Sequence, residues 1–223
     1  QASAPFVQYL DDDLLLEPKV IGRMVAVIEE ERCGFVGCPA AGLGYHDDVR
    51  PHQQCIEPWR GHVTPEPMVP GAIPWGRHVV NSAANPLHIA ERVLPDGGIV
   101  VSRGVGGGNL LYDREKLLDV GGFGFWDRLP VEHAGEEVAP QLLLLNRYGG
   151  CGILPTGTYH AGLATTVPDR EVNATSLYSV LFREDEERHS QASASDSGTD
   201  AVRSRALFAA CFSRECFASG PMR

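Results

Sequence analysis

The chain has 223 residues, 43% hydrophobic and 22% charged, which fits one large globular domain or one domain with a tail. Its 19 Lys and Arg residues against 29 Asp and Glu residues give a net charge of −10, which argues against a broad nucleic-acid-binding surface. The six cysteines form no CxxC pair, which argues against a zinc ribbon and predicts free thiols in a reducing cytoplasm. No apolar run is long enough to span a membrane, so we expect a cytoplasmic protein, with the inner face of the membrane as an alternative location.

The first predicted strand, residues 6–10, ends in three consecutive carboxylates, Asp11, Asp12 and Asp13. Adjacent carboxylates beside an apolar strand repel one another and need a compensating cation. Ligands of open α/β sheets bind at the carboxyl ends of strands. The stretch therefore predicts a site for Mg²⁺ or Mn²⁺ that is shared with a phosphate. The alternative is a charged loop that caps the next helix.

Apolar residues recur at helical spacing over residues 18–32, and a second short strand is expected at 35–38. Strand, helix and strand in this order predict a βαβ unit with parallel pairing. The segment 40–98 is irregular and contains five histidines, but none has the spacing of a metal-binding motif. We therefore interpret those histidines as surface or packing residues.

A further strand is expected at 99–102, followed by a glycine-rich run that ends in Gly107, Gly108 and Asn109. The run resembles a phosphate-binding loop only loosely, because Asn109 stands where the third glycine would be. Its glycines are expected to let the backbone approach a ligand or another strand. A strand at 110–112 and a short helix at 114–120 follow.

Phe125 and Trp126 belong to an aromatic cluster that could stack on sugar rings, although such clusters are more often core. Glu136 and Glu137 precede a helix predicted at 138–148, where carboxylates also serve as helix-dipole partners. A strand at 151–154 leads towards a lone histidine, His160.

The composition changes after residue 183, which divides the chain into a domain of residues 1–183 and a tail. The tail, residues 184–223, is acidic and Ser-rich, and we expect it to be largely disordered. Within the tail, residues 206–217 are apolar enough for a short helix.

Four separated pieces resemble glycosyltransferase family 2, whose members have the GT-A fold, and their order matches over residues 6–165. The first is the DxD motif of that fold, to which Leu10-Asp11-Asp12-Asp13 is similar. The other three pieces are Leu111–Glu115 with Val120–Phe123, Gly135-Glu136-Glu137, and Leu154-Pro155 with Tyr159-His160. The Asp-Asp-Asp form and Trp126 also look like the galactofuranosyltransferase branch, a looser similarity.

The resemblance implies an α/β fold with a GT-A, Rossmann-like mixed sheet flanked by helices. It implies an inverting, metal-dependent glycosyltransferase that moves a sugar from a nucleotide-diphosphate donor to a hydroxyl of a glycan, lipid-linked or small-molecule acceptor. Family members begin with strands that bind the nucleotide, whereas here the DxD strand comes almost first. We therefore expect the catalytic and acceptor portion of a longer protein, incomplete at its N-terminus, with one edge of the 6–10 strand open.

The resemblance also assigns roles to residues. Asp13 would ligate Mn²⁺ or Mg²⁺, and His160 would complete that metal site or contact the diphosphate. Asp11 would hold the donor ribose or a metal-bound water, and Asp12, Gly107 and Gly108 would also lie on the donor side. The acceptor side would have Trp126 and Phe125.

Glu137 would be the general base, by register, although the family usually has Asp there and Glu136 remains open as the base. Two alternatives differ in class. One is a non-catalytic remnant that binds a glycan or a protein partner. The other is a metal-dependent phosphohydrolase, ranked last because the sequence lacks a second carboxylate and histidine cluster for a two-metal site.

Overall fold

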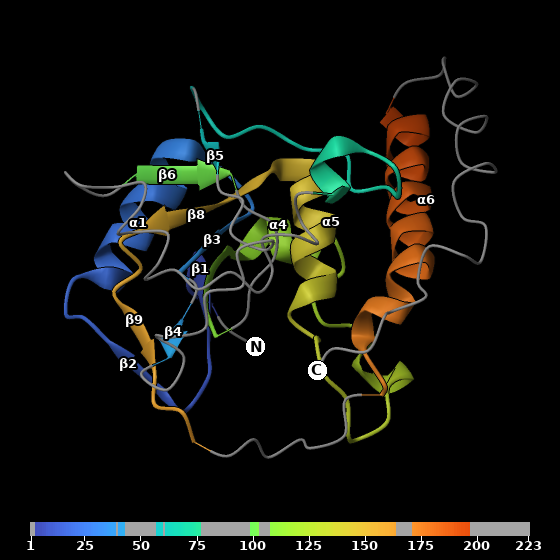
Figure 1. Ribbon diagram of the computed structural model, residues 1–223. Helices are drawn as coiled ribbons and strands as arrows, with labels where there is room; N and C mark the ends of the chain where they lie inside the picture. Colours follow the sequence, from blue (N-terminus) through green and yellow to red (C-terminus); the bar gives the residue numbers. More distant parts are fainter. Residues whose placement is uncertain are drawn as a thin grey trace.

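The computed structural model describes residues 3–38, 40–42, 57–59, 61–76, 99–102, 108–163 and 171–196. The described strands form a six-stranded sheet and a smaller three-stranded sheet (Figure 1). In spatial order, the larger sheet consists of β1 (Phe6–Leu10), β7 (Asn109–Asp113), β3 (Phe35–Gly37), β8 (Gly150–Leu154), β6 (Ile99–Ser102) and β5 (Glu57–Pro58). The smaller sheet consists of β2 (Leu14–Leu16), β9 (Thr158–His160) and β4 (Ala41–Gly42).

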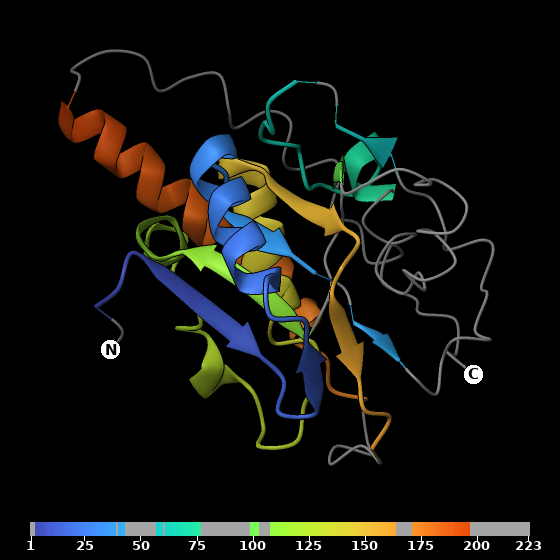
Figure 2. The same cartoon turned by 90° about the vertical axis from the view of Figure 1, so that its left-hand side faces the viewer.

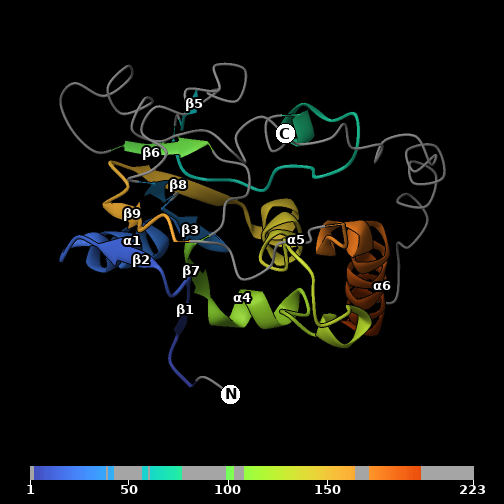
Figure 3. The ribbon, with the colours of Figure 1, turned by 60° about the horizontal axis from the view of Figure 1, so that its bottom comes forward.

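Helices cover both faces of the larger sheet (Figures 2 and 3). They are α1 (Val20–Glu31), α4 (Arg114–Asp119), α5 (Val138–Tyr148) and α6 (Tyr178–Asp196), with short 3-10 turns at Trp126–Arg128 and Ala174–Leu177. The mixed α/β class and the flanking helices are therefore confirmed. None of the helices in the described residues is long and apolar enough to cross a membrane.

The alternation of side chains along the strands builds a separate core on each face of the sheet. Val36 of β3 and Leu111 of β7 pack with α1 on one face. Phe35 and Tyr112, their neighbours in the sequence, pack with α5 and α6 on the other face. Helix α1 presents Val20, Met24 and Ile28 to its core, in the spacing of one helical stripe.

The predicted parallel pairing of the first two strands is wrong. Strand β7 lies between β1 and β3 and is antiparallel to both, so β1 and β3 run in the same direction without being neighbours. The parallel partner of β3 is β8. The strand–helix–strand pattern correctly gave the elements and their directions, but a strand from later in the chain is inserted between them.

Strand β1 lies at the edge of the six-stranded sheet, and within the described part of the chain its strand partner is β7. The expectation that one edge of residues 6–10 would be open is therefore confirmed for these residues. Its apolar residues Phe6 and Val7 are partly buried, and apolar edges favour pairing with other chains.

The prediction that disorder begins at residue 184 is wrong for residues 184–196, because α6 continues to Asp196. Tyr178, Leu181 and Phe182 bury their side chains against α5. Several of the charges that follow form ion pairs, with Arg128 and Arg147 among the partners. The later part of the predicted tail, with its 206–217 helix, lies outside the described residues. So do His46, His52, His78 and His88, whereas His62 is exposed, as expected for a surface residue.

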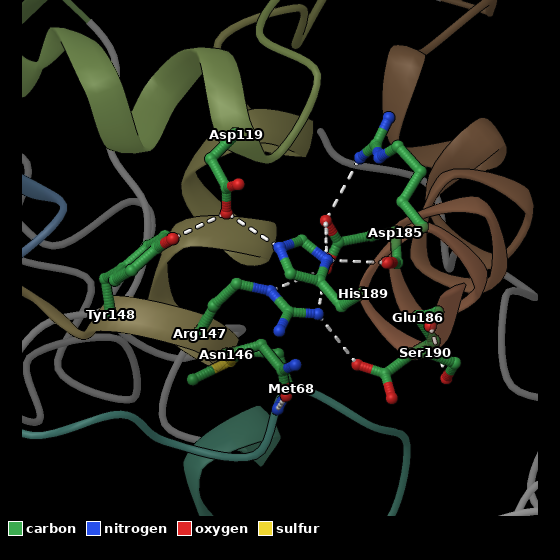
Figure 4. A network of polar contacts seen from close by, with 10 residues as sticks. Met68, Asp119, Asn146, Arg147, Tyr148, Asp185, Glu186, His189 and Ser190 are labelled. Atoms are coloured by element: carbon green, nitrogen blue, oxygen red, sulfur yellow. Dashed lines mark hydrogen bonds and ion pairs between the residues drawn. The ribbon is translucent and has the colours of Figure 1, made fainter. Parts of the chain in front are cut away.

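The centre of this pairing is Asp185, which is 1% exposed (Figure 4). Arg147, in the last turn of α5, donates to its Oδ2 from Nε at 3.1 Å and from Nη2 at 2.7 Å. Arg188 donates to the other oxygen at 3.0 Å. A buried carboxylate held by two guanidinium groups fastens α6 to α5.

We predict that Asp185→Ala destabilises the protein by about 3 kcal/mol, because it leaves Arg147 partly buried without its main partner. Urea unfolding at pH 7 measures the change. Glu187→Ala, an exposed position of the same helix, is the control and should change the free energy of unfolding by less than about 0.5 kcal/mol. Equal effects of the two substitutions would contradict a buried ion pair.

A second contact of α6 predicts a pH dependence. Partial burial raises the pKa of the Asp119 carboxyl, but hydrogen bonds from Tyr148 and His189 outweigh it and hold that pKa below its usual value. Its folded pKa is lower than its unfolded pKa of about 4, so its stabilisation is present above pH 4 and is lost as the pH falls through the folded pKa.

We therefore predict that Asp119→Asn lowers stability at pH 7 by no more than about 1 kcal/mol, since the carboxylate is partly exposed. The difference from the wild type should shrink towards zero at about pH 2. Urea midpoints of the two proteins between pH 2 and 7 test this, and a difference that does not depend on pH would rule out the carboxylate as its source.

Candidate functional site

The predicted Asp cluster lies where β1 ends and turns into β2. The Asp11 N–H donates to the carbonyl oxygen of Gly108 at 2.9 Å, which holds the turn against the start of β7. Asp11 and Asp13 are partly buried, whereas Asp12 is exposed. Burial, then the charges of Asp13 and Glu136, raise the pKa of Asp11, and His160 opposes them.

The two residues predicted as metal ligands come together. Strand β2 pairs with β9 so that Leu14 lies opposite His160, and the Ala161 N–H donates to the Asp13 carbonyl oxygen at 2.9 Å. The His160 Nε2 atom lies 3.0 Å from Asp13 Oδ2, with both side chains largely buried. Residues far apart in the sequence thus meet through a short two-stranded pairing.

The hydrogen bonds of His160 define its tautomer. The Gly162 backbone N–H donates to Nδ1 at 2.9 Å, so Nδ1 acts as an acceptor and carries no proton. The Nε2 atom then carries the N–H of the ring and faces Asp13 as a donor. In this arrangement Nε2 of His160 is directed at Asp13, so His160 orients that carboxylate.

Gly108 meets the expectation of a close backbone approach. Its φ of +92° lies in a region that favours glycine, and an added Cβ would lie 3.2 Å from Leu14 Cδ1 and 3.4 Å from Asp11 Oδ2. The other glycine predicted on the donor side, Gly107, lies outside the described residues.

Asn109, where the glycine pattern failed, has a structural role that sequence reasoning missed. The residue is fully buried, accepts a hydrogen bond from Gln8 on β1, and donates to Thr158 Oγ1 on β9 at 2.8 Å. It therefore ties the strand before Asp11 to the strand that carries His160. The one signal in the sequence was the Asn itself, in a run otherwise made of glycine and apolar residues.

Glu136 and Glu137 lie just before α5, and both act on Tyr9 of β1. The Tyr9 hydroxyl on β1 donates to Glu136 Oε1 at 2.9 Å. Burial, then the hydrogen bond and charge of Glu136, raise the pKa of Tyr9, with smaller effects from Glu137 and Asp11. The structure thus brings Asp11, Asp13, His160 and Glu136 into one group, and Tyr9 is a member that sequence reasoning missed.

The two aromatic residues predicted on the acceptor side, Phe125 and Trp126, differ in their exposure to solvent. Phe125 is 3% exposed and packs against Phe123 at a ring distance of 6.3 Å, so its predicted contact with an acceptor is wrong: no ring face is accessible. Trp126 is 55% exposed and meets His133 edge to face at 4.9 Å. The prediction of stacking on a sugar stays open for Trp126 alone.

No group of three or more His, Cys, Asp or Glu residues in the described ranges is arranged to hold a metal ion. Asp11, Asp13 and His160 thus do not by themselves form such a group. No known protein-family model, curated protein or solved structure matches this chain.

We predict that Gly108→Ala destabilises the protein by about 1–3 kcal/mol, because alanine is strained at this φ and its Cβ presses on Leu14 and Asp11. The matched control is Gly22→Ala, in the exposed interior of α1, where an added Cβ meets nothing within 4 Å. That substitution should stabilise the protein by about 0.5–1 kcal/mol. Thermal and urea unfolding of both variants test the opposite signs.

Proposed function

We propose that this chain carries the catalytic and acceptor portion of an inverting, metal-dependent glycosyltransferase of the GT-A type. The observation that supports it most is the pairing of Asp13 with His160 at 3.0 Å beside the partly buried Asp11. A second support is Glu136, which precedes α5, accepts a hydrogen bond from Tyr9 and acts on the pKa of Asp11. Acidic residues from β1 and α5 thus lie on two sides of one site.

We propose that the carboxylates at the end of β1 would hold a hard divalent cation that keeps most of its coordination shell for other ligands. Asp13 and Asp11 supply carboxylate oxygens, and Mg²⁺ is commonly held by one or two carboxylates together with substrate phosphates. When bound, the cation would neutralise the diphosphate of the departing nucleotide. His160, whose Nε2 faces Asp13 Oδ2, would keep that carboxylate oriented.

The proton transfer would be carried out by a glutamate. Glu137 would take the proton from the acceptor hydroxyl as that hydroxyl attacks the anomeric carbon. A single attack from the side opposite the leaving group inverts the configuration at that carbon. Trp126, with its exposed ring, would support the acceptor sugar.

We predict that Asp13→Ala weakens Mn²⁺ binding by at least about tenfold without unfolding the protein, since it removes a carboxylate from a site with few other donors. Calorimetry with MnCl₂, alone and with UDP, GDP or CDP, measures the loss. Glu30→Gln, an exposed residue of α1, removes one negative charge elsewhere and should leave binding unchanged. Equal losses in both variants would show general charge attraction instead of a site.

We predict that Glu137→Gln lowers transfer by about 10²–10⁴-fold while nucleotide binding is kept, because Gln is close in shape and cannot accept the proton. A panel of sugar nucleotides with Mn²⁺, assayed for nucleotide release and for glycosylated product, measures it. If Glu136→Gln is the inactive variant and Glu137→Gln is active, Glu136 is the base. Nucleotide or glycan binding without turnover by the wild type would favour the non-catalytic alternative.

A further inference from the structure

Strand β1 pairs with β7 along one edge, and within the described part of the chain its other edge meets no strand. Two backbone hydrogen bonds show which residues use the edge towards β7. The Asp11 N–H donates to the Gly108 oxygen at 2.9 Å, and the Arg114 N–H donates to the Pro5 oxygen at 2.9 Å. Both bonds continue the β1–β7 register by one residue, at opposite ends of the strand.

The alternation of an antiparallel ladder then assigns the backbone groups along β1. Because the residues just before and just after the strand turn their backbone groups towards β7, Val7 and Tyr9 do the same. Phe6, Gln8 and Leu10 therefore turn their N–H and carbonyl groups to the outer edge. This edge offers an evenly spaced row of donors and acceptors, the chemistry that an added strand recognises.

The side chains of β1 do not block such pairing. Edge strands of soluble proteins commonly carry lysine, proline, an inward charge or a bulge, each of which prevents strand addition. Strand β1, Phe-Val-Gln-Tyr-Leu, contains no charged residue and no proline, and all five residues pair with β7 in one unbroken register. Leu10 is 45% exposed, whereas Phe6 is partly buried against the α1 core. An added strand would cover Leu10.

The acidic turn at Asp11, Asp12 and Asp13 limits how a second copy of the chain could add its β1. Parallel addition would place the two acidic turns side by side. An antiparallel copy with Leu10 opposite Leu10 would leave the turns only about 7 Å apart along the strands. An antiparallel copy centred on Gln8 separates them by about 20 Å, more than twice the screening length of about 8 Å at physiological salt.

The register centred on Gln8 also pairs every outer backbone group. It places Gln8 opposite Gln8 of the second copy, and Phe6 of each copy opposite Leu10 of the other. Each of these residues then donates one hydrogen bond and accepts one. A slide of two residues in either direction leaves the outer groups of one residue in each copy unpaired. The register that repels least is therefore the one that bonds most, and it packs the exposed Leu10 beside a phenylalanine.

We propose that β1 is a dimerisation strand, to which a second copy of this chain adds its own β1 in the antiparallel register centred on Gln8. The two six-stranded sheets would then join into one continuous sheet across a two-fold axis. The position of β1 at the periphery of the fold leaves its outer edge facing away from β7 and β3 (Figure 3). The dimer concerns the edge of the sheet and does not depend on whether the chain transfers sugar.

Sedimentation equilibrium of the full chain tests the dimer. We expect a reversible equilibrium between the 24.1 kDa chain and a species of twice that mass. Leu10→Lys should raise the dissociation constant by at least about tenfold, because it places a charge against Phe6 of the second copy. Leu118→Lys is the matched control, since Leu118 is a 56% exposed leucine near the end of α4, and it should leave the dissociation constant unchanged.

Gln8→Pro tests the backbone pairing itself. It removes the outward N–H at the centre of the register, so both bonds between the two Gln8 residues are lost. Proline is tolerated in an edge strand where the N–H does not face the neighbouring strand of the sheet. Circular dichroism and urea unfolding establish that each variant is folded. The dimer should weaken in both Gln8→Pro and Leu10→Lys, so either folded variant decides the proposal.

Amide hydrogen exchange of the wild type, followed residue by residue by NMR, tests the register. The amides of Phe6, Gln8 and Leu10 should become more protected as the protein concentration rises. Those of Val7 and Tyr9 should not change, because they are already bonded to β7. A dimer formed through another surface would not produce this alternation.

A chain that stays monomeric at the highest concentration reached would overturn the proposal. So would a dimer that Leu10→Lys and Leu118→Lys weaken equally, or one that a folded Gln8→Pro leaves intact. Equal changes in protection at odd and even positions of β1 would overturn the register. None of these outcomes depends on a sugar nucleotide, so a failure of the proposed transferase function is distinguished from a failure of the dimer.

Discussion

The antiparallel strand β7 is the constraint on which the arrangement of the site depends. It pairs with β1 on one edge and with β3 on the other, so that Tyr112 lies opposite both Val7 and Phe35. A shift of one residue in this register would move Leu110 and Tyr112 out of their core and onto the α1 face. Because the register is fixed by packing on both faces, so is the place where β7 begins, next to the Asp11 turn.

Hydrogen bonds link the start of β7 to the candidate site. Gly108 accepts the Asp11 N–H, and Asn109 reaches Gln8 on one side and Thr158 on the other. Thr158 is the first residue of β9, whose last residue is His160. The end of β1, the start of β7 and the strand that carries His160 are thus joined by bonds between buried groups, which explains how Asp13 and His160 meet.

Local patterns predicted the elements well and their spatial neighbours poorly. The α1 and α5 helices and the short apolar strands follow from spacing and turn residues, which act within a few positions along the chain. The insertion of β7 between β1 and β3 depends on contacts between distant segments, which spacing does not encode. Helix α6 was missed because its charges were read as solvated, whereas Asp185 is buried and held by Arg147 and Arg188.

The site could be predicted where residue type and chemistry coincide. The resemblance to glycosyltransferase family 2 implied that Asp13 and His160 meet, and the structure brings them together beside Asp11. Phe125 was assigned to the surface from its type alone, and the structure buries it. Tyr9 resembled an ordinary strand residue, and its hydrogen bond to Glu136 becomes visible only when α5 is placed beside β1.

Two groups of carboxylates in this protein differ in whether positive charges balance them. This difference distinguishes a structural ion pair from the candidate site. Asp185 is as buried as any core residue, but two arginines neutralise it, and it needs nothing from outside. At the end of β1, the largest charges that act on Asp11 are those of Asp13 and Glu136, and His160 opposes them. Tyr9 donates a hydrogen bond there but brings no positive charge.

Partly buried carboxylates in such a group either bind protons or attract a cation from solution. His160, whose Nε2 lies 3.0 Å from Asp13 Oδ2, opposes the effect of the neighbouring carboxylates on the pKa of Asp11. Among the described residues, the negative charges that act on Asp11 therefore outnumber the positive one. This imbalance is the physical reason to place the candidate site at the end of β1 and not at the more deeply buried Asp185.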